Sequence, residues 1–381
     1  MNLQGMSSQV KYGILICFIL GIINYQLHAQ VSYFHIESPQ NPTLYLDLII
    51  QDSIGVISLD APILTYPAWM EGKMDRSSGE WKFLSQDSRA IELSFLLKNK
   101  VLENLKIVSR VGDNLNIPKL AIGESKGSLS FKILHFKYKK PLIPEIKTSP
   151  AASYDFLFPE PQFSSNHAIK DSVRKLLYVK YMGESNLSLA TSKAITNYIN
   201  QLALQYREEN RDIYDPSNPS MILNHEFNIK PLVICNSKFL LSIAVQKYVY
   251  TGGAHGLEAT QFINVNLKNG KEYSLSELLQ INNSWIVGSL LQLIKQKIQE
   301  KYGLSPEESL TNAGFFTDEI GLPVEFYLTP SGIGFFYNVY EIAPYALGPI
   351  HVFLQWNELK MLMGENLWIL PNEFYENSLG N

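Results

Sequence analysis

The sequence predicts an α+β protein, with an antiparallel sheet and packed helices in its C-terminal part and a smaller all-β domain before it. Two observations lead to this class. Before residue 142, short runs rich in β-branched and aromatic residues recur between turn-forming residues. After residue 153, stretches with apolar residues at helical spacing alternate with further strand-like runs.

The first thirty residues have the pattern of an export signal. Lys11 is the only charged residue before residue 30, and an apolar run of 12 residues, YGILICFILGII, follows it. Such a run is too short to span a bilayer, and Ala29 suits the position before a cleavage site. A retained N-terminal anchor is the alternative, and Ile16 before Cys17 argues against lipid attachment. We expect cleavage near Ala29, a periplasmic or secreted product, and no transmembrane helix in the mature chain.

The bulk composition excludes some classes of partner. A chain of 381 residues is long enough for two domains. Its net charge of −4 and pI of about 6.0 give no sign of the basic surface that nucleic acid requires. Cleavage at Ala29 leaves Cys235 as the only cysteine, and its apolar neighbours predict a buried, inert thiol.

An all-β domain is predicted for residues 31–142. Its strands are expected within residues 43–50, 55–64, 78–85, 90–99 and 126–140. The next segment, 143–153, belongs to a proline-rich stretch that contains Pro141, Pro144 and Pro150, and proline stiffens an extended spacer. We therefore predict a linker there, and we expect a chain that starts near Ala151 to fold alone.

An α+β domain is predicted for residues 154–375. Apolar residues at helical spacing predict helices around 169–177, 195–206 and 287–298, with Gly183 and Gly303 as their stop signals. Strands are expected at 231–236 and 238–250, joined by an Asn-Ser turn, and at 259–267. A hairpin-like end over 324–356 and a short helix at 356–363 complete this domain.

The segment TGGAHG, residues 251–256, lies between two predicted strands. Gly252, Gly253 and Gly256 are predicted where the reversal needs positive φ. His255 and Glu258 flank the turn, and these two side chains are too few for a zinc site. A structural turn is the first interpretation, a partner-contacting turn the second and a metal site the third; we expect no metal and no cofactor.

Catalytic signatures are scarce. GESKG, residues 123–127, matches G-x-S-x-G around Ser125, but a strand-like run follows where a nucleophile elbow needs a helix. Glu307 and Glu308 follow Pro306, as in the first turn of a helix. No residue is assigned a catalytic role, although a pair of glycosidase carboxylates stays an open alternative because such pairs meet only in the fold.

Two stretches carry a family resemblance. Residues 248–279, from YVYTGGAHGLEA onward, and residues 326–360, which include YNVYEIAPYALGP, resemble a C-terminal domain of unknown function. That domain is shared by RsiV-type lysozyme-sensing anti-sigma factors and PdaC-type peptidoglycan deacetylases. The resemblance covers about Lys238 to Met363, and residues 166–210 resemble its usual N-terminal companion more loosely. It implies a non-catalytic domain that binds lysozyme in the anti-sigma factors.

The loop YNVYEIAPYALGP, residues 337–349, supplies the predicted binding residues. Pro344 and Pro349 stiffen it before a partner arrives. Tyr345 lies at its tip, where a core role is unnatural, whereas we expect Tyr337 and Tyr340 to pack the core and brace the turn. The predicted ligand-binding residues are Tyr345, Glu341, Pro344, His255 and Glu258.

Three functions follow from these patterns. The first is an exported, non-catalytic module of the cell envelope that binds a lysozyme-like protein or a peptidoglycan fragment. The second is a hydrolase that acts on cell-wall glycan. The third is a structural envelope protein without a discrete ligand.

Overall fold

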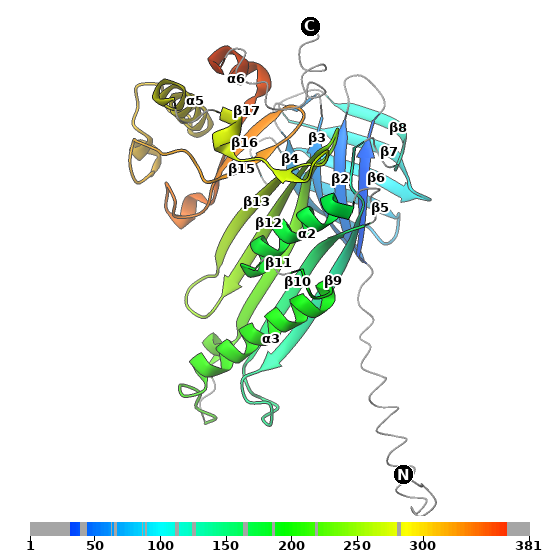
Figure 1. Ribbon diagram of the computed structural model, residues 1–381, viewed down its shortest axis with the longest axis vertical. Helices are drawn as coiled ribbons and strands as arrows, with labels where there is room; N and C mark the ends of the chain where they lie inside the picture. The colour runs from blue at the N-terminus through cyan, green and yellow to red at the C-terminus, as the bar shows by residue number, and fades with distance from the viewer. Residues whose placement is uncertain are drawn as a thin grey trace, which may run out of the picture. The chain divides into compact units, whose positions relative to one another are not determined.

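The computed structural model describes residues 31–38, 44–61, 63–64, 67–85, 87, 90–110, 114–123, 127–162, 167–184, 187–217, 220–279 and 283–363. The predicted signal peptide, Ser125 and the end of the predicted C-terminal domain lie outside these ranges. The described residues belong to the unit Val31–Asn381. Figure 1 shows its helices and strands.

The first sheet has eight strands, each hydrogen-bonded to the next in the chain. Its strands are β1 (Val31–Glu37), β2 (Tyr45–Gln51), β3 (Ile54–Asp60), β4 (Ala68–Met74), β5 (Glu80–Ser85), β6 (Glu92–Lys98), β7 (Val101–Val108) and β8 (Leu115–Ala121). The sheet is curled, and alternate residues such as Trp81, Phe83 and Phe95 form a core on one face. The ring of Phe83 fills the space beside Gly72 that a Cβ would need. An all-β N-terminal part is thereby confirmed.

The second sheet has six strands in the order β14-β13-β12-β11-β10-β9. They are β9 (Phe131–Pro141), β10 (Ala151–Pro161), β11 (His225–Ser237), β12 (Leu240–Tyr250), β13 (Leu257–Asn266) and β14 (Lys271–Glu272). All neighbours are antiparallel except β10 and β11, which run parallel. Helices α2 (His167–Met182) and α3 (Thr191–Asn210) cover one face of this sheet and share its core (Figure 1).

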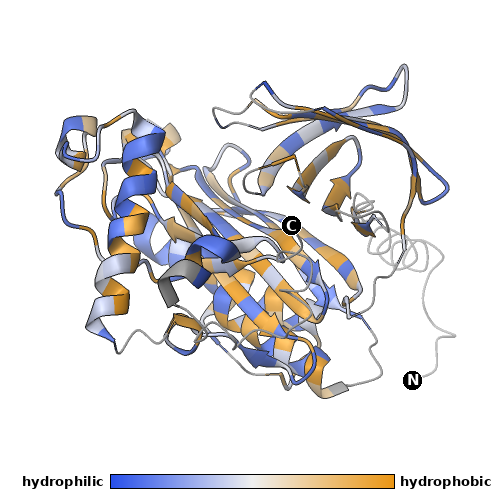
Figure 2. Cartoon of the chain, turned by 90° about the horizontal axis from the view of Figure 1, so that it is seen from above, coloured by the Kyte–Doolittle hydropathy of each residue, from blue (hydrophilic) through white to orange (hydrophobic). Residues whose placement is uncertain are grey.

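The third sheet has three strands, β15 (Glu325–Leu328), β16 (Gly332–Tyr337) and β17 (Ile350–Gln355). It packs with α4 (Leu275–Leu279), α5 (Ser284–Tyr302) and α6 (Trp356–Met363) around a core of its own. The side chain of Asn283 caps α5 by accepting from the N–H groups of Trp285 and Ile286, and Gly303 ends the helix with a φ of 70°. The predicted α+β class is confirmed, and Figure 2 shows apolar and polar residues alternating along the elements.

The proline-rich segment differs from the predicted spacer. Strand β9 pairs with β10 over its whole length, so residues 142–150 are the connection of a hairpin and β10 already begins at Ala151. The Leu142 N–H donates to the Pro150 carbonyl at 2.8 Å, and Ser149 Oγ accepts from the Ile143 N–H at 2.8 Å. Proline fits such a connection as well as it fits a linker. Independent folding of the two predicted domains stays a prediction.

Aromatic side chains packed around Trp69 join the three sheets. Trp69 on β4 lies 5.2 Å from Tyr327 on β15 and 6.2 Å from Phe262 on β13, measured between ring centroids. Phe336 and His351, both on the third sheet, also pack against the ring of Trp69. The face of the first sheet opposite to its own core therefore packs against the other two sheets.

A buried carboxyl group lies at the same junction. Ser331 Oγ donates to Asp60 Oδ2 at 2.7 Å, and Asp60 is 8% exposed. Burial raises the pKa of Asp60 to about 6, while the hydrogen bonds from Ser331 and Thr329 act in the opposite direction.

The raised pKa of Asp60 predicts that the stability of the protein depends on pH. The folded pKa of Asp60 exceeds its ordinary value, so its contribution to stability is complete below about pH 4 and is lost as the pH rises through about 6. We expect the free energy of unfolding, measured by urea titration between pH 4 and 7, to decrease over this window less steeply in Asp60→Asn than in the wild type. Equal slopes for the two proteins would show that Asp60 is not the responsible group.

The described helices include none that is both long and apolar enough to cross a membrane.

Candidate functional site

The two predicted contact segments meet in the structure. His255 lies in the turn between β12 and β13, and Tyr345 opens the short helix η3 (Tyr345–Leu347) directly after Pro344. Their rings stack, with centroids 4.1 Å apart and planes at 19°. Tyr340 extends the stack at 5.8 Å from Tyr345. These three rings, which we call the aromatic cluster, come from segments more than 80 residues apart in the chain.

The sequence interpretation of Tyr340 was wrong. This side chain is 49% exposed, whereas Tyr337 is 2% exposed and donates its hydroxyl to the Gly321 carbonyl at 2.8 Å. Tyr340 also has a φ of 69°, which is rare for a bulky residue. Its N–H donates to the Ala343 carbonyl at 3.1 Å, so the tight turn of the loop holds this conformation. Strained backbone of this kind often accompanies functional contacts.

Asn338 fastens the Tyr345 loop to β13. Its side chain accepts from the N–H of Thr260 at 2.6 Å and donates to the Thr260 carbonyl at 3.1 Å. The same amide lies 3.2 Å from Glu341 Oε1 and donates to it. Sequence inspection missed Asn338, although an asparagine at the end of a strand is a common turn signal. Its bonds fix the loop relative to the sheet.

The glycines of the turn have two different roles. Gly252 and Gly253 have φ values of 99° and 101°, which a Cβ makes costly. Gly256 does not have positive φ, contrary to the prediction. A Cβ there would lie 2.4 Å from the ring of Tyr248, so this position needs glycine for close packing. His255 Nδ1 donates to the Gly256 carbonyl at 2.9 Å.

A substitution in this turn tests the argument from backbone angles. Gly253→Val is expected to lower the free energy of unfolding by roughly 1–2 kcal/mol, because no atom lies near the new Cβ and only the positive φ opposes it. Gly321→Val is the matched control, since Gly321 is open and does not have positive φ. His255→Ala should change stability little. Equal urea midpoints for Gly253→Val and the wild type would contradict this explanation.

A polar groove of about 550 Å³ runs beside the aromatic cluster. Asn228, Tyr248 and Glu258 lie opposite one another on β11, β12 and β13, so their side chains share one face of the second sheet. Lys230, Gln246 and Thr260 line it further along, and Glu71 of β4 lines its border. The other end of this face, around Phe262, is covered by the junction with Trp69.

The surface around the aromatic cluster carries mainly negatively charged side chains. Glu226, Glu258 and Glu341 are exposed. Partial burial raises the pKa of the Tyr248 hydroxyl, and the carboxylates of Glu226 and Glu258 raise it further. The predicted residues Glu341 and Glu258 thus lie on the same part of the molecule as His255 and Tyr345.

Three observations concern the residues considered for metal binding and catalysis. No three His, Cys, Asp or Glu side chains in that part of the chain gather as a metal site requires. Cys235 is 1% exposed, and burial raises the pKa of its thiol far above the ordinary value. Glu308 accepts from the Ser305 N–H at 2.7 Å in a turn, where a helix was predicted to begin.

A second, larger groove crosses the first sheet. It has a volume of about 810 Å³ and is lined by the exposed apolar residues Ile54, Leu84 and Val108, among others. Glu71 borders both grooves.

Comparisons with known proteins match two regions of the chain. A family model described as Deacetylase PdaC matches residues 147–258, and one described as a protein of unknown function, DUF3298, matches residues 285–357. The resemblance found in the sequence is confirmed, with different boundaries: the TGGAHG turn falls in the PdaC match and Tyr345 in the DUF3298 match. The aromatic cluster therefore joins the two matched regions.

Two solved structures are similar to this chain, and the first of them shares its fold. A DUF3298 family member from Bacteroides fragilis is 23% identical with a TM-score of 0.58, covering 67% of this chain and 99% of its own. A DUF3298 family protein from Pseudomonas aeruginosa is 18% identical with a TM-score of 0.35, covering 63% of this chain and 96% of its own. No curated protein matches the chain.

Proposed function

We propose that this chain, which joins a PdaC-like region to a DUF3298 region, is an exported, non-catalytic binding module of the cell envelope whose ligand is a protein. The stack of His255 on Tyr345 carries the proposal. Exposed aromatic side chains on a stiff loop suit a protein interface, because they offer large contact area at a low cost in conformational entropy. Asn338 and Pro344 supply that stiffness.

The surrounding charge favours a basic protein. Glu226, Glu258 and Glu341 attract a cationic partner and accelerate its association. The resemblance to lysozyme-sensing anti-sigma factors makes a lysozyme-like protein the first candidate. In that complex, Tyr345 and Tyr340 would supply the apolar contacts and the carboxylates would contact basic side chains.

A cell-wall glycan is the second candidate, and the polar groove favours it. Asn228, Gln246 and Thr260 offer neutral donors and acceptors for sugar hydroxyl groups, and the ring of Tyr248 offers an apolar surface. Hydrolysis of that glycan is a weaker proposal, because no residue of the groove is assigned a catalytic role.

A direct binding experiment separates these candidates. The mature chain, immobilised, is titrated with chicken-type lysozyme, with cytochrome c as a basic control protein, and with soluble peptidoglycan fragments. Saturable binding of lysozyme alone supports the first candidate, and binding of the fragments alone supports the second. If cytochrome c binds as tightly as lysozyme, the contact is nonspecific charge attraction and the proposal fails. Product analysis of the fragments tests hydrolysis.

Export is part of this proposal. The lone Lys11, the short apolar run and Ala29 predict a mature N-terminus near Gln30 or Val31 and a product in the periplasm or medium. Fractionation of expressing cells followed by N-terminal sequencing checks this. An intact Met1 in the membrane fraction would contradict it and favour a retained anchor.

A further inference from the structure

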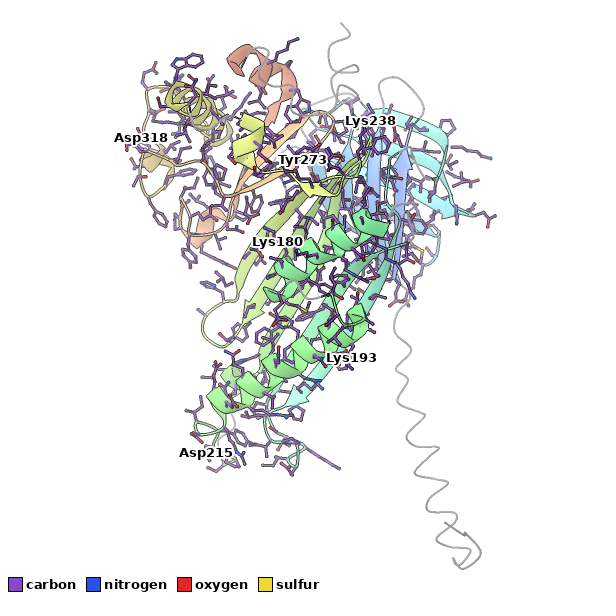
Figure 3. The ribbon with its side chains drawn as sticks, in the orientation of Figure 1. Lys180, Lys193, Asp215, Lys238, Tyr273 and Asp318 are labelled. Atoms are coloured by element: carbon purple, nitrogen blue, oxygen red, sulfur yellow. The ribbon has the colours of Figure 1, made fainter. Side chains whose placement is uncertain are left out.

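A third, smaller cavity is lined by none of the three residues of the aromatic cluster. It has a volume of about 270 Å³ and is lined by residues of α2, of β13, of the segment from β14 into α4, and of β15. Lys180 comes from the PdaC match, Glu325 from the DUF3298 match, and Glu272 from the residues between the two matches. Figure 3 labels Lys180 on α2 and Tyr273, which follows Glu272 in the chain. Cavities between adjoining structural regions are common ligand sites.

Charged groups of both signs line this cavity, and Lys180 attracts both carboxylates through space without a direct salt bridge to either among the described residues. Within the described part of the chain, neither the Lys180 ammonium nor the Glu272 carboxylate has a hydrogen-bond or ion-pair partner. Glu325 Oε2 accepts from the Phe262 N–H at 2.7 Å, and this bond fixes the carboxylate at the cavity. All three side chains are half-buried. Half-buried charges without partners are costly, so a ligand with complementary charges would be stabilised here.

The pKa shifts agree with this geometry. Burial raises the pKa of both Glu272 and Glu325, and Lys180 opposes the shift in each case. Each carboxylate would therefore gain from an additional cation.

We propose that this cavity binds a small zwitterion, namely a free amino acid. Its ammonium group would lie between Glu272 and Glu325, and its carboxylate would pair with Lys180. Val324, which is 84% exposed, and Phe326 supply apolar surface for its side chain. Binding would connect the PdaC-like and DUF3298 regions through one ligand, a role separate from the protein contact proposed for the aromatic cluster.

The test is isothermal titration of the mature chain with both enantiomers of alanine, glutamate and lysine. At least one should bind, and its N-acetyl and C-amide derivatives should each bind roughly tenfold more weakly or worse, because each loses one charged contact. Absence of heat with all six amino acids at about 10 mM would overturn the proposal. Equal binding of the C-amide derivative would also overturn it, since the site would then be a cation site.

Substitutions of residues that line the cavity test whether the amino acid binds there. Lys180→Met and Glu272→Gln should weaken binding roughly tenfold or more, while Lys175→Met, on the same helix and exposed, should not change it. Circular dichroism melts confirm that each variant is folded. Unchanged binding in folded Lys180→Met and Glu272→Gln would place the amino acid elsewhere. Tyr345→Ala should bind the amino acid normally, so failure of the protein-binding proposal leaves this result unaffected.

Discussion

Trp69→Ala is expected to lower the free energy of unfolding by about 3–5 kcal/mol, the usual cost of removing a large aromatic side chain from a packed site. The ring touches four others, from Phe262, Tyr327, Phe336 and His351. These partners belong to the second and third sheets, so the cavity would open at the junction rather than inside the first sheet. Urea unfolding monitored by far-UV circular dichroism measures the change.

Two further variants test whether the lost stability comes from the junction around Trp69. Leu84→Ala, on the same face of the first sheet but 52% exposed, should change stability by about 0.5 kcal/mol or less. Trp69→Phe, which keeps an aromatic ring, should lose clearly less than Trp69→Ala. A Trp69→Ala protein that unfolds at the wild-type urea concentration would show that the sheets do not depend on this junction.

The same measurement bears on the predicted domains. If residues 31–142 and 154–375 fold independently, Trp69→Ala should split unfolding into two transitions or leave one half stable. If the junction couples them, one cooperative transition should move as a whole. A chain that starts near Ala151 lacks both Trp69 and β9, and its melting curve gives an independent answer.

Tyr345→Ala is expected to weaken binding of the protein ligand by about 2 kcal/mol, or roughly 30-fold in Kd. The substitution removes the ring that lies between His255 and Tyr340, so the exposed cluster loses its central member. Because Tyr345 is only partly buried, the fold should be little affected. Titration of Tyr345→Ala beside the wild type with lysozyme, the first candidate, measures the effect.

Matched variants separate the ring from general surface effects. Tyr345→Phe keeps the stack and should bind nearly as the wild type does. Trp285→Ala removes a more accessible aromatic residue, 65% exposed on α5, and should not alter binding. Wild-type affinity in a folded Tyr345→Ala protein would remove the loop from the binding site.

Local sequence signals predicted most elements of the fold. Apolar spacing located α2, α3 and α5, because a helix that covers a sheet must present one apolar stripe. Gly183 and Gly303 were correctly predicted as helix stops, and both have positive φ. Strand β10 was missed because it contains Pro159 and Pro161, and proline argues against a strand. Both prolines lie beyond the part of β10 that pairs with β11.

Turn chemistry was a weaker guide. The hairpin between β11 and β12 turns at Lys238 and Phe239, both at positive φ, rather than at the predicted Asn-Ser pair. Neither residue type favours that conformation, so propensity gave no signal. The pairing of long strands on either side fixes the turn here.

The sequence by itself determined the fold class, the order of most elements and the residue types of the TGGAHG turn and of the loop 337–349, because these depend on neighbours along the chain. Only the tertiary structure decided that His255 stacks on Tyr345, that Asn338 ties the loop to β13, and that Gly256 makes room for Tyr248. The charged cavity of Lys180, Glu272 and Glu325 was likewise decided by packing. Each of these contacts joins different elements, and the packing of those elements, rather than any local pattern, sets the distances between their side chains.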